Sequence, residues 1–115
     1  MSTDTIFGKI LRGEIPCDKV YETSEVLAFR DINPAAPSHV LIIPKRRIQN
    51  AGFAEENDKE ILGAMILAAQ EVAKVEGVFE TGYRLVFNVG PDAAESVPHL
   101  HLHVIGGRSL GWPPG

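Results

Sequence analysis

Apolar residues recur with helical spacing in two segments of the chain. Residues 5–11 carry a short apolar face, and the threonine at the first position can cap a helix there. A longer helix is expected from Asn57 or Asp58 to Glu76, where Gly77 can end it in a left-handed conformation.

Shorter apolar runs predict strands. Alternating or consecutive apolar residues over about four to eight positions, bounded by turn-forming residues, are typical of strands. We expect strands at residues 20–22, 26–29, 39–44, 83–88 and 99–105. The strand at 39–44 is apolar at consecutive positions, so both of its faces should be covered.

These elements predict one domain, residues 1–115, with an α+β fold. Hairpin-length links between strand pairs favour a mainly antiparallel sheet, accompanied by one long helix and a short N-terminal helix. The proline-rich segment 31–37 and the segment 89–97 are expected to be loops.

The long helix has an unusually wide apolar face. Its apolar residues cover an arc of about 160°, whereas a helix lying on a sheet needs only about 100°. The extra width of this face is explained either by a wide stripe of core residues or by a second contact, such as another subunit. The residues of this arc are Ile61, Leu62, Met65, Ile66, Ala68, Ala69, Val72 and Ala73.

Composition and charge narrow the classes of function. The net charge of −4 argues against binding nucleic acid through its phosphates, which needs a clustered basic stripe. The basic run Lys45, Arg46 and Arg47 is interpreted as a solvated strand end. Cys17 is the single cysteine, so a reducing, cytoplasmic location is expected. No segment has the apolar length that a signal peptide or a membrane span requires, so no membrane association is expected.

Three histidines alternate with apolar residues near the C-terminal end. Because a strand has a period of two, His99, His101 and His103 are expected on one face of the last strand. The apolar residues between them would then point to the other face and into the core.

The pattern alone leaves three interpretations open. It can be a polar strand face, although three strictly alternating histidines are rarely just that. Three imidazoles also suit zinc, with His39 as a fourth ligand. Finally, a neutral imidazole is a nucleophile that can attack phosphorus while its neighbours bind the phosphoryl oxygens. The preceding loop, from Asn88 to Val97 and including Ser96, offers hydrogen-bond donors for a phosphate.

The segment His99–Ile105 resembles the signature of the histidine triad (HIT) superfamily. Residues 4–10, residues 27–32 with the proline-rich loop after them, and residues 106–108 and 112–115 resemble its Hint branch, the purine nucleoside phosphoramidases. The resemblance therefore extends over nearly the whole chain.

The resemblance implies a role for each matching residue. His101 would be the nucleophile, flanked by His99 and His103, and His39 would support the nucleophile through a hydrogen bond. Asp31 would accept hydrogen bonds from the ribose hydroxyls. The other implied substrate-binding residues are an apolar slot for the purine (Ile6, Phe7, Ile10, Ile15, Phe29 and Ile32), the phosphate-side residues Asn88 and Ser96, and Val97.

The activity that the resemblance implies is hydrolysis of the P–N bond in purine nucleoside 5′-phosphoramidates, such as adenosine 5′-monophosphoramidate, through a covalent nucleotidyl-histidine. It implies no metal and no other cofactor, and a homodimer in which Trp112 of the C-terminal tail comes near the partner's site. Cleavage of dinucleoside polyphosphates, or a nucleotide-sensing binding module with slow catalysis, are the alternatives. Arg30 and the pair Ala94-Glu95 replace a frequent histidine and Gly-Gln, which bears on rate and leaving group.

Overall fold

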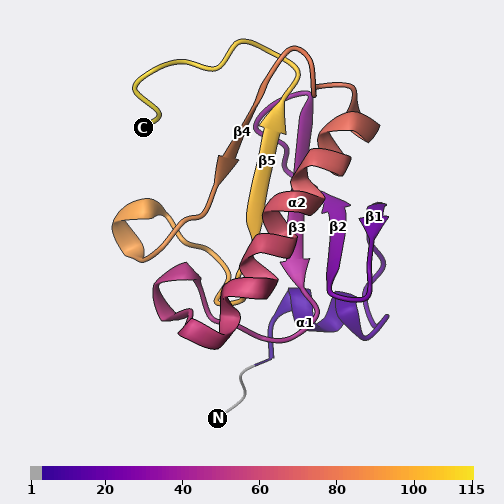
Figure 1. Ribbon diagram of the computed structural model, residues 1–115, viewed down its shortest axis with the longest axis vertical. Coiled ribbons are helices and arrows are strands. Elements are labelled where there is room, and N and C mark those ends of the chain that lie inside the picture. The colour runs from indigo at the N-terminus through magenta and orange to yellow at the C-terminus, as the bar shows by residue number, and fades with distance from the viewer. Residues whose placement is uncertain (1–3) are drawn as a thin grey trace.

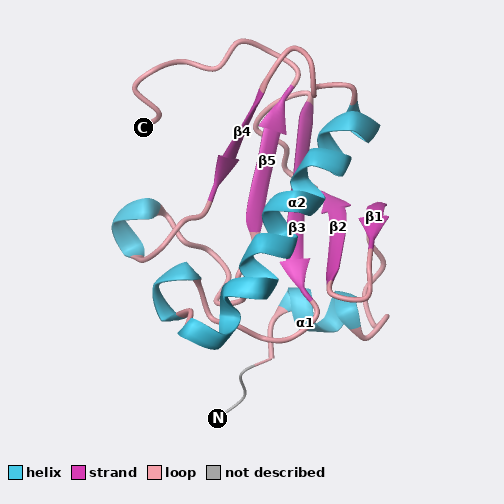
Figure 2. Cartoon of the chain, viewed as in Figure 1, coloured by secondary structure: helices cyan, strands magenta, loops and turns pink. Residues whose placement is uncertain are grey.

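The computed structural model describes residues 4–115 and is built around a five-stranded antiparallel sheet (Figures 1 and 2). Along the sheet the strands follow the order β1-β2-β3-β5-β4. The elements are α1 (Ile6–Leu11), β1 (Lys19–Glu22), β2 (Val26–Arg30), β3 (Ser38–Pro44), η1 (Ala51–Phe53), η2 (Glu56–Asp58), α2 (Lys59–Glu76), β4 (Tyr83–Val86), η3 (Pro91–Ala93) and β5 (Leu102–Gly106). The expected α+β fold is confirmed.

The two faces of the sheet carry separate apolar clusters. Helix α2 crosses one face, as Figure 1 shows, and covers Val40, Ile42 and Leu102. The other face carries a smaller cluster that includes Phe7 of α1 and Leu41 of β3. Strand β3 is buried along its whole length, so the prediction that both of its faces are covered is confirmed.

Two strands are shorter than the pattern predicts. The strand expected at 83–88 ends at Val86, and the one expected at 99–105 begins only at Leu102. Pro44 ends β3 and has no N–H, so the ladder between β3 and β5 cannot continue past it. The backbone N–H of Leu100 instead donates to the Ile48 carbonyl at 2.6 Å.

Most of the wide apolar arc of α2 is core. Six of its eight residues, including Met65 with no exposed surface, are buried against the sheet. Ile66 and the adjacent Leu67 are exposed, and Leu62 is half-buried. The helix ends as predicted, because Gly77 takes a left-handed conformation with φ of 75°.

The side chains of the basic run 45–47, which follows β3, form local contacts. Lys45 pairs with Glu22 at 2.7 Å and Arg46 pairs with Asp58. Arg47 donates to a backbone carbonyl instead of a carboxylate. The three residues are exposed at the end of β3, as the interpretation of a solvated strand end required, and the structure adds the local contacts of their side chains. Within residues 4–115, no helix combines the length and hydropathy needed to cross a membrane.

Candidate functional site

A cavity of about 350 Å³ lies between α1, the end of β2, the middle of β3 and the chain around the start of β5. Cavities of this size hold small-molecule ligands and are usually lined mainly by apolar side chains. Eleven of the residues singled out in the sequence line it: Ile6, Phe7, Ile10, Ile15, Phe29, Asp31, Ile32, Ser96, Val97, His101 and His103. His39, Asn88 and His99 are not among the lining residues and reach the site through hydrogen bonds.

The lining also includes residues that the sequence analysis did not select. Pro16, Cys17 and Asp18 form part of the wall where the chain enters β1, and Leu41 contributes from β3. Only their spatial position identifies them, since a turn before a short strand and a buried strand leucine carry no chemical signal in the sequence. Ile32 is 87% exposed, so it stands at the mouth of the cavity and not inside the slot.

His101 is held by its own backbone segment. Its Nδ1–H donates to the His99 carbonyl at 2.7 Å, since a carbonyl can only accept. A neutral imidazole with its proton on Nδ1 has a free lone pair on Nε2. Among the residues that the structure describes, none forms a hydrogen bond with that Nε2, and the ring lines the cavity. His101 is therefore presented as a nucleophile or a base.

A chain of hydrogen bonds fixes the proton on His103. The backbone N–H of Ala35 donates to His39 Nδ1 at 2.9 Å, so the neutral His39 ring carries its proton on Nε2. That Nε2 lies 2.9 Å from His103 Nδ1 and donates to it. The neutral His103 ring therefore has its N–H at Nε2, which lies 3.5 Å from the amide of Asn88. His39 thus supports His103, not His101 as the resemblance implied.

Asp31 lies beside His39 in this chain of hydrogen bonds. One of its oxygens, Oδ1, accepts the Asn33 N–H at 2.8 Å and closes the turn that begins the proline-rich loop. The other, Oδ2, lies 3.5 Å from His39 Nε2. The carboxylate combines a turn-capping role with a place in the cavity wall.

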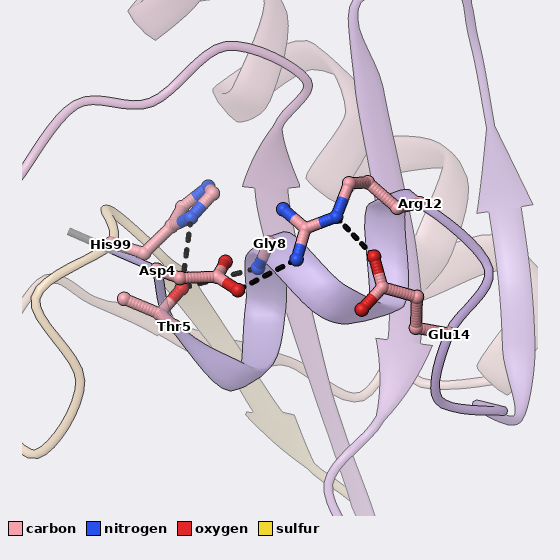
Figure 3. A network of polar contacts seen from close by, with 6 residues as sticks. All are labelled: Asp4, Thr5, Gly8, Arg12, Glu14 and His99. Atoms are coloured by element: carbon pink, nitrogen blue, oxygen red, sulfur yellow. Dashed lines mark hydrogen bonds and ion pairs between the residues drawn. The ribbon is translucent and has the colours of Figure 1, made fainter. Parts of the chain in front are cut away.

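Both ring nitrogens of His99 lie within hydrogen-bond distance of residues that do not line the cavity. Its Nε2–H donates to the Pro44 carbonyl at 3.3 Å, and its Nδ1 lies 3.4 Å from the Thr5 hydroxyl. Figure 3 shows this contact beside the Asp4–Arg12 ion pair, whose two residues flank α1. Thr5 also accepts the Gly8 N–H, so His99 anchors the capped start of α1. His99 contacts the site through its carbonyl, which holds His101, and its ring does not line the cavity.

Burial keeps three of the four histidines neutral. Desolvation lowers the pKa of His39 and of His99 below the ordinary value of 6.5. The pKa of His103 is lowered to about 4, first by burial and then by the positive charges that His101 and His39 would carry. The relay through His39 is thus neutral at physiological pH.

These shifts predict an acid-sensitive fold. Between a pH of about 6.5 and about 4, the unfolded chain binds protons at these histidines that the folded chain does not bind, so the free energy of unfolding falls as the pH is lowered through this window. Thermal unfolding at about pH 7 and about pH 4.5 measures the effect, and a His103→Asn variant should lose less stability than the native chain. Equal midpoints at the two pH values would contradict the buried neutral relay.

The Glu95 carboxylate, in the loop between β4 and β5, accepts hydrogen bonds from nearby protein groups. Its Oε1 accepts the Gly90 N–H at 2.8 Å and the Asn50 side-chain amide at 3.0 Å. The carboxylate therefore closes the loop, and Glu95 is not among the residues that line the cavity. Ala94 takes a left-handed conformation with φ of 59°, which costs a residue other than glycine about 1–2 kcal/mol.

One group of described residues has the composition of a metal site. Ligand atoms of Asp31, His39 and His103 lie within 4.8 Å of one another. A metal on His39 Nε2 would need a lone pair there, but His39 Nδ1 already uses its lone pair to accept the Ala35 N–H. A neutral ring cannot offer both nitrogens as acceptors, so these residues do not fit a resident zinc ion without breaking that bond.

The geometry agrees with comparisons to known proteins. The HIT domain family matches residues 12–110. An uncharacterised HIT-like protein of Synechococcus elongatus is 53% identical over 115 residues, the full length of both chains, and a 14 kDa zinc-binding protein of Zea mays is 55% identical over 113 residues, covering 96% of this chain and 88% of that protein.

Solved structures extend the match to the fold. The crystal structure of a HIT family hydrolase from Legionella pneumophila has a TM-score of 0.94 and 47% identity, covering 97% of this chain and all of the other. A histidine triad protein from Clostridium difficile has a TM-score of 0.91 and 39% identity, covering 96% of both chains. The family match and these relatives show that the chain belongs to the HIT family.

Proposed function

We propose that this chain is a hydrolase of the Hint branch that cleaves the P–N bond of purine nucleoside 5′-phosphoramidates. The observation that carries the proposal is the His101 ring, whose proton is fixed on Nδ1 by the His99 carbonyl while Nε2 is free beside the cavity. A neutral imidazole held in this way is ready to attack phosphorus and to form a covalent nucleotidyl-enzyme.

The neighbouring groups fit the two steps of such a reaction. His101 Nε2 forms a bond to phosphorus while the P–N bond to the leaving amine breaks, and the amine takes up a proton from water at the open mouth of the site. The His103 N–H donates to a phosphoryl oxygen, where negative charge builds up. Water then attacks phosphorus, breaks its bond to Nε2 and releases the nucleoside monophosphate.

The rest of the cavity suits a purine nucleoside. Phe7 and Phe29 pack edge to face, with ring centroids 5.6 Å apart, and Leu41 lies beneath them. This apolar slot can hold a planar base, and its position beside the Asp31 carboxylate leaves the ribose hydroxyls next to an acceptor. The six residues of the apolar slot carry no polar side-chain group that could distinguish adenine from guanine, so the proposal includes both nucleotides.

A screen of leaving groups tests this function. Adenosine 5′-phosphoramidate should be hydrolysed with a kcat/KM at least about tenfold above that of a dinucleoside polyphosphate. Because the proposal needs no metal, a chelator should leave the rate unchanged, whatever metal the plant relatives named as zinc-binding proteins hold. Preferred cleavage of the polyphosphate, nucleotide binding without turnover, or loss of activity together with about one zinc per chain would each contradict it.

We also propose that the chain is cytoplasmic and forms a homodimer. Leu62, Ile66 and Leu67 leave an apolar strip on α2, and the β4 edge beside Leu85 is open to another strand. An isologous contact would cover both features. The single exposed Cys17 is compatible with the reducing cytoplasm.

Light scattering at micromolar concentration should give a dimer mass, and Leu67→Glu should shift the mass toward that of a monomer without unfolding, because Leu67 is exposed in the single chain. Met65→Glu is not a test of assembly, since Met65 is fully buried beneath α2 and a charge there would disrupt the core. A native monomer would refute the dimer.

A further inference from the structure

His101 lies outside the sheet, so the ladder of β5 does not set its position. Strand β5 begins at Leu102, and the His101 ring is oriented by the His99 carbonyl. The position of the proposed nucleophile therefore depends on how the segment from Pro98 to Leu100 is held.

That segment is held by the chain that follows β3. The Leu100 N–H donates to the Ile48 carbonyl at 2.6 Å, and the His99 ring donates to the Pro44 carbonyl. At the start of the segment, Arg47 donates to the Pro98 carbonyl from both Nε and Nη2, at 3.1 and 2.6 Å. Two donors of one planar guanidinium fix a carbonyl more tightly than a single flexible donor can.

Arg47 differs from the two basic residues before it. Lys45 and Arg46 pair with carboxylates, whereas Arg47 donates to the backbone carbonyl of Pro98, next to the histidine triad. Its charge also lies close enough to His99 to lower the pKa of that ring, in addition to the larger effect of burial. A neutral His99 with its proton on Nε2 fits both contacts, since Nε2–H donates to the Pro44 carbonyl and Nδ1 can accept from the Thr5 hydroxyl.

We infer that Arg47 is a positioning residue for His101, which it acts on by clamping the Pro98 carbonyl and thereby the His99 carbonyl that orients the nucleophile. This inference rests on the proposed role of His101. Arg47 is an exposed residue that does not line the cavity, and without this role it would be grouped with the solvated charges of the surface.

Kinetics of Arg47 variants test the inference. A misplaced nucleophile lowers kcat with little effect on substrate binding, so Arg47→Ala should reduce kcat about tenfold or more while the Kd of AMP stays within about twofold. Arg47→Lys should recover only part of the loss, because one ammonium cannot replace the two-donor fork. Guanidinium ion at millimolar concentration should restore part of the activity of Arg47→Ala.

Arg46→Ala is the matched control, since it removes the same charge from the adjacent position but leaves the Pro98 carbonyl held. It should keep kcat near the native value and show no response to guanidinium. A loss in Arg46→Ala as large as that in Arg47→Ala, or native kcat in Arg47→Ala, would overturn the inference.

A second readout does not depend on turnover. In ¹⁵N NMR spectra the His101 Nδ1–H signal should be sharp in the native chain and in Arg46→Ala, and should shift or broaden in Arg47→Ala. Native spectra in Arg47→Ala would show that the clamp does not orient the ring. If phosphoramidates are not substrates at all, the proposed function fails, while the spectra still decide whether Arg47 positions His101.

Discussion

His101→Ala is expected to lower kcat for phosphoramidate hydrolysis by several orders of magnitude. The variant loses the group that forms the covalent bond to phosphorus, and no other imidazole can replace it. His103 has its N–H on the side away from His39, and both ring nitrogens of His99 are occupied by Thr5 and Pro44. Steady-state and single-turnover rates measure the loss.

The control for this variant is nucleotide affinity. The apolar slot and Asp31 are unchanged in His101→Ala, so AMP should bind with a Kd close to that of the native chain, as calorimetry can show. Thermal unfolding should also stay near native, because the His101 side chain lines the cavity and forms one hydrogen bond with its own segment. Substantial remaining turnover in a folded variant would exclude His101 as the nucleophile.

Removing both ribose hydroxyls from the substrate is expected to lower kcat/KM by roughly 10- to 150-fold. Hydrogen bonds from two hydroxyls to the Asp31 carboxylate are charge-assisted and contribute about 1.5–3 kcal/mol where water is excluded. Comparing ribo- and 2′,3′-dideoxy-phosphoramidates measures this discrimination directly.

Asp31→Asn should lose much of that discrimination and still fold. An asparagine can keep the cap on the Asn33 N–H through its Oδ1, so the proline-rich loop should survive while the charge is lost. If the native enzyme treats the two substrates alike, Asp31 is only a turn residue. If Asp31→Asn unfolds, Asp31→Glu with a dideoxy substrate provides the alternative comparison.

The alternation of histidine with leucine was sufficient to predict which side chains share a face. The pleat of a strand puts Leu100, Leu102 and Val104 into the core beneath α2 and the histidines opposite, and this holds even before β5 formally begins. The start of the strand could not be predicted, because it depends on the missing N–H of Pro44 in a neighbouring strand far away in sequence.

The partners of the histidines were also beyond sequence reasoning. His39 was expected to support the nucleophile, but the tautomer set by the Ala35 N–H directs its proton to His103. The engagement of His99 by Thr5 depends on how α1 packs against the end of β3. The wide face of α2 was ambiguous for a related reason, since only packing reveals that Met65 is core and Leu67 is not.

Intact-mass analysis after a rapid acid-free quench tests the central claim most directly. With adenosine 5′-phosphoramidate in single turnover, the native chain should gain the mass of one adenylyl group, and peptide mapping should place it on His101. His101→Ala should gain none. An adduct on another residue would contradict the covalent mechanism. Full turnover without any adduct, under conditions in which the adduct should accumulate, would contradict it as well.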